Sequence, residues 1–137
     1  MVDDSVKGTL QDQFNYVGSG WSHCTNCNQS NPVVTYYNAS HSGDSTTNDY
    51  VTIAFKGTKI AYYGVTAPWM GLAAVSIDGG TAVSVNLYSA AKTGNVLVWT
   101  SPALPYGAHT LKIRNTGTKN ASSTGTTLSL DRVNITN

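Results

Sequence analysis

Apolar residues in this chain alternate with polar residues over short segments, and no stretch spaces them convincingly three and four residues apart. Alternation with a period of two is typical of strands that bury one face, whereas an amphipathic helix needs the longer spacing. Nine segments show the alternation: 12–17, 33–37, 50–55, 59–65, 72–77, 82–87, 96–99, 109–114 and 127–135. Many short strands with frequent turns predict an all-β protein, an antiparallel β-sandwich or barrel.

The composition excludes several other classes. Glu is absent from the 137 residues, and Ser, Thr, Asn and Gly together supply 57 of them, so the strong helix formers are scarce. Only 11% of the residues are charged, and a net charge of +1 without a basic cluster argues against nucleic-acid binding. No apolar run approaches the roughly 20 residues that cross a bilayer, so we expect no membrane partner. Eight Tyr and three Trp argue against disorder.

The length suits one domain, and we expect residues 1–137 to form a single module taken from a larger protein. The first residues lack the apolar core of a signal peptide. Surface polarity that comes from hydroxyls and amides suits a secreted, extracellular module. Cys24 and Cys27 leave three interpretations open: a loop disulfide or free thiols, a zinc site that would need further ligands, and a redox motif that would need a βαβ setting.

Connections in an antiparallel sandwich alternate between its two ends, and this rule predicts which loops lie together. The short turns 56–58 and 78–80 contain Gly, which favours tight hairpins, and they fall at one end with the Pro-containing segment 101–107. Four segments fall at the opposite end, which we call the rim: 38–49, 66–71, 88–95 and 116–126. All of these except 66–71 are long, at about eight to twelve residues, and loops of that length are often functional. Segment 18–32 is predicted at the end opposite the rim.

Catalytic patterns are missing from the sequence. A glycosidase needs two carboxylates that flank the bond, and Asp44 and Asp49 are the one pair that shares a predicted loop. There is no Gly-x-Ser-x-Gly elbow or phosphate-binding loop, and His23, His41 and His109 are dispersed. We therefore expect a protein that is not an enzyme.

Aromatic and amide side chains remain as candidate ligand contacts, because sugar rings stack on aromatic faces and their hydroxyls pair with polar groups. Trp69, which follows Pro68 in a short loop, is the sharpest candidate platform; the alternative is a lid on the core. The alternative for Asn120 is to stabilise a turn, and the alternative for His41 is to hydrogen-bond the backbone of its own loop. The candidate ligand-binding residues are Trp69, Asn120, His41, Lys119, Tyr37, Asp44 and Tyr88.

Other aromatic residues have more ordinary predicted roles. Tyr62 and Tyr63 are adjacent on one strand, so one of them faces the core, and the same holds for Tyr36 and Tyr37. Trp99 ends a strand and is expected in the core. His109 is expected to have a structural role.

Several blocks, in this order along the chain, resemble the galactose-binding-domain-like jelly-roll modules appended to secreted bacterial glycoside hydrolases. The blocks are FNYVGS at 14–19, VTIAFKG at 51–57, IAYYG at 60–64, AVSIDGG at 74–80, GAHTLKI at 107–113, GTKNASS at 117–123 and DRV at 131–133. The resemblance covers most of the chain and is carried by the order of the blocks.

This resemblance implies a carbohydrate-binding module of the type 6, 32 or 35 kind, which binds glycans through loops at one end and leaves cleavage to an attached catalytic domain. It also implies a structural calcium held by an acidic residue of the first strand and one of the last. By position these are Asp12 and Asp131, although Asp12 lies in Gln11-Asp12-Gln13, without the Glu common in such modules.

The sequence therefore predicts a monomeric, non-catalytic domain that binds a polysaccharide or oligosaccharide and directs an attached glycoside hydrolase to it. The alternative is a structural or adhesive spacer that packs against a catalytic neighbour and has no sugar site. Exposure of Trp69 distinguishes the two, since a buried Trp69 favours the spacer.

Overall fold

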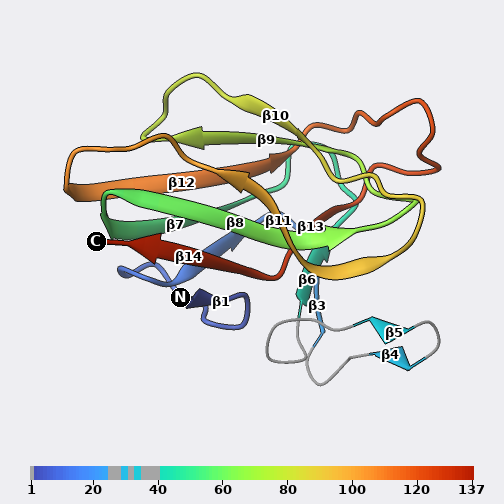
Figure 1. Ribbon diagram of the computed structural model, residues 1–137, viewed down its shortest axis with the longest axis horizontal. Helices are drawn as coiled ribbons and strands as arrows, with labels where there is room; N and C mark the ends of the chain where they lie inside the picture. The colour runs from blue at the N-terminus through green and yellow to red at the C-terminus, as the bar shows by residue number, and fades with distance from the viewer. Residues whose placement is uncertain (1, 25–28, 31–32, 35–40) are drawn as a thin grey trace.

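Two eight-residue strands, β7 (Tyr50–Gly57) and β8 (Lys59–Thr66), are joined through Thr58 and lie in different layers of the structure (Figure 1). This computed structural model describes residues 2–24, 29–30, 33–34 and 41–137. The other strands are β1 (Val2–Asp3), β2 (Phe14–Val17), β3 (Trp21–Cys24), β4 (Gln29–Ser30), β5 (Val33–Val34), β6 (His41–Asp44), β9 (Leu72–Ile77), β10 (Val83–Asn86), β11 (Thr93–Thr100), β12 (Gly107–Asn115), β13 (Leu128–Leu130) and β14 (Arg132–Thr136). The described part of the chain contains no helix, and so none that could span a membrane.

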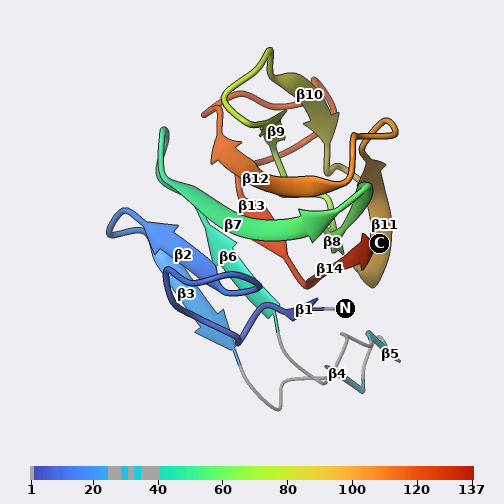
Figure 2. The ribbon, with the colours of Figure 1, turned by 90° about the vertical axis from the view of Figure 1, so that its left-hand side faces the viewer.

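The strands form an antiparallel sandwich, which confirms the predicted fold class. One layer is a five-stranded sheet in the order β10-β9-β12-β7-β2. The facing layer combines a four-stranded sheet, β1-β14-β8-β11, with a three-stranded sheet, β13-β6-β3 (Figure 2). The two parts of this layer are continuous in the chain, because β14 follows β13 after the single residue Asp131.

The core lies between the layers and follows the alternation seen in the sequence. Along β7 the side chains of Val51, Ile53 and Phe55 are buried, while those between them are more exposed. Tyr62 is fully buried, and Tyr63 lies half-buried on the outer side with the Arg132 guanidinium 3.6 Å from its ring centroid. One tyrosine of this pair is therefore core, as predicted.

The connections gather at the two ends as the alternation rule predicts. At the rim, on the right in Figure 1, Ala67 bridges to Tyr88, Met70 bridges to Thr127, and Asn48 N donates to Asn115 O at 2.8 Å. At the opposite end, Leu104 N donates to Thr58 O at 2.7 Å. Loops far apart in the sequence are thus neighbours in space.

Three local predictions were wrong. Residues 56–58 do not close a hairpin: they form a corner, because β7 and β8 belong to different sheets. Residues 41–44 lie in β6 and not in a loop. The segment after β2 turns at the rim and not at the opposite end, since Gly20 N donates to Asp49 Oδ2 at 2.8 Å. Most residues of β3 and β6 are polar, so backbone pairing between the two strands identifies them and an alternation of apolar residues does not.

The corner at Gly57 leads to a test of the packing between the layers. A Cβ atom on Gly57 would lie 2.4 Å from Thr136 O, whereas one on its strand partner Gly107 would meet nothing within 4 Å. We expect Gly57→Ala to lower the free energy of unfolding by about 1–3 kcal/mol, and Gly107→Ala to change it by less than about 0.5 kcal/mol. Urea denaturation measures both variants. Equal effects would contradict the close approach of β14 to this corner.

Candidate functional site

Trp69 stands at the rim on a loop whose backbone is fixed on several sides. Trp69 O accepts from Thr127 N at 3.3 Å, and Pro68 O accepts from Thr124 N at 2.9 Å. A Cβ atom at Gly125 would lie 2.7 Å from Trp69 O, so Gly at this position permits the close approach. The loops 67–71 and 116–127 therefore hold one another.

Ser123 reinforces this frame from inside. Its side chain is 4% exposed, and Oγ lies within hydrogen-bond distance of Met70 O (2.6 Å), Gly125 O (2.9 Å) and Pro68 O (3.0 Å). One hydroxyl donates one proton at a time, so these three carbonyls share a single donor. We call this set of contacts the brace, because it holds the backbone on both sides of Trp69.

The Trp69 side chain is only partly covered by its neighbours. The side chain is 39% exposed, and Lys92 Nζ lies 5.6 Å from the ring centroid, within the range of a cation–π contact. Tyr88 is half-buried in the neighbouring loop and bridges to Ala67. The structure thus brings Lys92 to Trp69 from a different loop, and it pairs the backbone of Tyr88 with the Trp69 loop at Ala67.

Lys119 and Asn120 belong to the same rim, but their polar groups address their own loop. Lys119 Nζ donates to Ser123 O at 2.8 Å. Asn120 Oδ1 accepts from Ser122 N at 2.9 Å, and Asn120 O accepts from Ser123 N at 2.9 Å, as in an Asx turn. Asn120 therefore stabilises a turn, which was the alternative to ligand binding. Its oxygen atoms are used in this turn, and its amide nitrogen is the group that is left to donate to a ligand.

Asp44 is placed inside the rim rather than on its surface, because it ends β6 and is 1% exposed. Its Oδ1 accepts from Thr46 N at 2.7 Å, and its Oδ2 has no hydrogen-bond partner among the described residues. Burial, followed by the nearby Asp49 carboxyl, raises the pKa of Asp44 from 3.8 to about 6.

Asn115, which sequence reasoning missed, links these parts of the rim. Its side chain is 1% exposed, and Nδ2 donates to Asp44 O and to Thr126 O, both at 3.0 Å. Its Oδ1 accepts from Gly117 N at 2.9 Å. The available signal was an Asn at the end of a strand with Gly two residues later, a pattern that favours an Asx turn.

Two other predicted contacts are described only in part or not at all. His41 begins β6, where its backbone pairs with Cys24 of β3. Tyr37 lies outside the described residues, as does Cys27, so the interpretations of the two cysteines stay untested.

A cluster of three carboxylates lies on the β1 side of the molecule. Asp3, Asp4 and Asp131 are 8%, 1% and 0% exposed, and each offers an oxygen within 4.8 Å of the others. Asp4 N also donates to Asp131 O at 3.0 Å. Buried like charges are costly unless a positive charge compensates them. Carboxylate oxygens are the ligands that calcium takes, so this donor set fits the ion by type.

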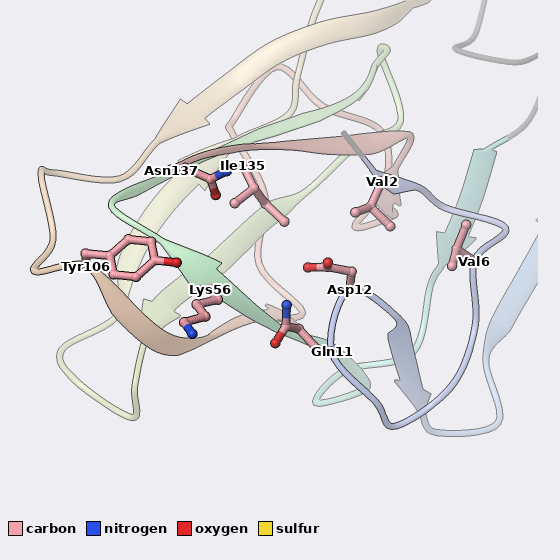
Figure 3. Close-up of a pocket in the computed structure, with 8 residues that line it drawn as sticks. All are labelled: Val2, Val6, Gln11, Asp12, Lys56, Tyr106, Ile135 and Asn137. Atoms are coloured by element: carbon pink, nitrogen blue, oxygen red, sulfur yellow. The ribbon is translucent and has the colours of Figure 1, made fainter.

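Asp131 therefore meets Asp3 and Asp4, and not Asp12 with which the sequence paired it. Asp12 is exposed and lies before β2, beside Gln11 and Lys56 in a separate pocket (Figure 3). The adjacent Asp3-Asp4 pair was the available signal, but its place beside β14 depends on the pairing of Asp3 with Arg132.

A contact between serine and histidine lies beside this cluster. Ser42, 0% exposed, donates from Oγ to Asp4 Oδ2 at 2.6 Å, and His23 Nδ1 lies 2.7 Å from the same Oγ. The serine proton is thus directed to the carboxylate and not to the imidazole. A serine nucleophile requires the reverse order, with the histidine as base and an accessible oxygen.

Trp99 and His109 lie where their structural roles were predicted. Trp99 packs against the core. His109 Nδ1 lies 2.6 Å from Asp78 Oδ2 and Nε2 lies 2.7 Å from Pro105 O, so the ring joins two turns at the end opposite the rim. Its contacts with Asp78 and then Pro105 raise the pKa of His109, because the protonated ring can donate to both acceptors.

The chain is similar to solved structures of carbohydrate-active enzymes. One is a two-domain esterase active on acetylated mannans, crystallised with mannopentaose, with a TM-score of 0.50 and 13% identity. Another is a Paenibacillus xanthan lyase, with a TM-score of 0.57 and 16% identity. The matches cover 66% and 90% of this chain but only 26% and 12% of those chains. At these identities the likeness establishes the fold.

No protein-family model and no curated protein sequence matches this chain.

The Asp44–Asp49 pair makes a testable contribution to stability. A pKa that is raised in the folded state stabilises the fold below the unfolded value of about 4, and this contribution is lost as pH rises through about 6. Asp44→Asn keeps an acceptor for Thr46 N and supplies a donor without a charge. We expect its free energy of unfolding, relative to the wild type, to rise by on the order of 1 kcal/mol from pH 4 to pH 7.

Asp78→Asn is the matched control, because His109 lowers the pKa of Asp78 and the pH dependence of stability then has the opposite sign. The stability of Asp78→Asn relative to the wild type should fall as the pH rises to about 4, the unfolded value of an Asp, and should not rise between about pH 4 and pH 6. Urea denaturation at several pH values measures both differences. A flat difference for Asp44→Asn would show that the pKa of Asp44 is not raised in the folded state.

Proposed function

We propose that this domain is a non-catalytic carbohydrate-binding module of the galactose-binding-domain-like kind, and that it binds a polysaccharide through the rim. Trp69 is the platform for a sugar ring, and Tyr88, Lys92 and the amide nitrogen of Asn120 address its hydroxyls. We further propose that the domain is secreted, acts as a monomer and directs an attached catalytic domain to its substrate.

The observation that carries this proposal is a partly exposed tryptophan on a fixed loop. An exposed indole costs free energy in water, and a spacer domain has no use for a brace beneath it. A platform that is rigid before binding loses less conformational entropy when a ligand arrives. The exposure of Trp69 thus favours a binding module over the spacer.

The carboxylates of the rim support a non-catalytic role. The two carboxyl groups of a glycosidase lie on either side of the scissile bond, at least about 5 Å apart. Asp44 is buried where no substrate reaches it, and Asp49 Oδ2 accepts from Gly20 N at 2.8 Å. The contact of Ser42 with His23 has its proton directed to Asp4, as described above.

We propose calcium as the structural ion of this domain, held by Asp3, Asp4 and Asp131. These residues would supply oxygen ligands and join β1 to the segment between β13 and β14. The ion would compensate their charge and fix the first strand on the sandwich.

Trp69→Ala tests the proposed function. Since a buried aromatic contact often contributes about 2 kcal/mol or more, we expect binding to weaken at least about tenfold. Affinity electrophoresis in gels that contain mannan, acetylated mannan or xanthan measures the effect; the structural neighbours suggest these first probes. Leu97→Ala, which removes an exposed apolar side chain from β11, is the control.

If neither these gels nor a wider panel of neutral and acidic polysaccharides retained the wild type, the binding module would be rejected and the spacer favoured. Retention that Trp69→Ala leaves unchanged would reject the rim as the site.

Calcium binding predicts a rise in melting temperature when calcium is added after chelation. A ligand at 100 times its Kd stabilises the folded state by about 2.7 kcal/mol. We expect Asp131→Asn to abolish this rise and Asp12→Asn to retain it, since Asp12 lies outside the cluster. Differential scanning calorimetry with calcium, and with magnesium for comparison, measures the shift. No response in the wild type would exclude the ion, and a response that needs Asp12 would reject the assignment to this cluster.

A further inference from the structure

A pocket opens at the end opposite the rim, along the seam between the two layers (Figure 3). Its volume is about 510 Å³, and sites for small ligands commonly hold about 300–1,000 Å³. The aliphatic side chains of Val2, Val6 and Ile135 line one part of it, Tyr106 contributes an aromatic ring, and the other lining side chains are polar. We call it the seam pocket.

Tyr106 presents an aromatic face at the mouth of the seam pocket. It is 62% exposed, the second most exposed of the large apolar side chains in the described residues. The residues before it are anchored: Leu104 N donates to Thr58 O at 2.7 Å, and Pro105 O accepts from His109 Nε2 at 2.7 Å. Lys56 Nζ lies 5.6 Å from the ring centroid. The ring is thus presented from a loop that is ordered before any ligand arrives.

Asp12 faces the same space from the opposite wall. Its φ of +60° lies in the left-handed region, and its N–H donates to Ala54 O at 2.7 Å. Asp is among the residues other than Gly that adopt this conformation most readily. The carboxylate points into the pocket in Figure 3.

The polar groups around the pocket are of mixed type. Lys56 only donates, the Asp12 carboxylate only accepts, and the amides of Gln11 and Asn137 do both. Lys56 and Asp12 carry opposite charges, so the lining side chains together have no net charge. The pocket's match is a neutral molecule with many hydroxyls and an apolar face for Tyr106, which is the chemistry of a sugar ring.

We propose that the seam pocket is a second binding site, for a neutral oligosaccharide, with Tyr106 as its platform. Asp12 and Lys56 hold the hydroxyls of the bound sugar. The site lies at the opposite end of the sandwich from Trp69, so the two bind separately and one can exist without the other.

Titration with neutral pentasaccharides tests this site on the whole chain. The probes are mannopentaose, cellopentaose and xylopentaose, and the readouts are backbone amide shifts in NMR spectra and the Kd for each end. With at least one probe we expect shifts at Gln11, Asp12 and Gly107, and Tyr106→Ala should weaken that response at least tenfold. Tyr106→Phe should retain it, because the ring remains. Lys56→Ala should weaken it, whereas Lys59→Ala, an exposed lysine outside the pocket, should not.

One variant at each end distinguishes binding at the seam pocket from binding at the rim. Trp69→Ala should leave the shifts around Asp12 unchanged, and Tyr106→Ala should leave those of the rim unchanged. Shifts at the rim alone, or no shift with any probe, would overturn the second site. Shifts around Asp12 alone would support it and reject the rim.

Discussion

The packing of alternate side chains between two facing sheets is the constraint on which both ends of this domain depend. Val51, Ile53 and Phe55 point inward because a strand turns successive residues to opposite faces, and the facing strands do the same. Once the strands are held side by side in this way, every second connection emerges at the same end. Loops far apart in the chain then meet, and Trp69 comes to lie beside Lys92.

Much of this architecture was predictable because its cause is local. The strand at 72–77 has its predicted bounds, and the predicted strands at 50–55 and 59–65 are each extended slightly. The strands β3 and β6 were not predictable, because their residues are mainly polar and their place depends on pairing with each other. Ser42 is fully buried in β6, which no pattern of hydrophobicity indicates.

The candidate site shows the same division. The rim position of Trp69, Tyr88 and Asn120 followed from counting connections, a property of the chain order. The burial of Asp44 and the meeting of Asp131 with Asp3 and Asp4 did not follow, because they depend on which strands become neighbours across the sheet. Sequence spacing carries little information about such contacts. Asp12 and Asp131 each lie near a strand end, yet only one of them joins the acidic cluster.

The brace beneath Trp69 is made of backbone carbonyls, one serine hydroxyl and a glycine, and none of these contacts involves the indole. The frame and the side chain that it carries are therefore independent. A different residue at position 69 would be carried by the same backbone frame. Under the proposed function, a single substitution at this position would change the ligand-binding surface without removing any contact of the frame.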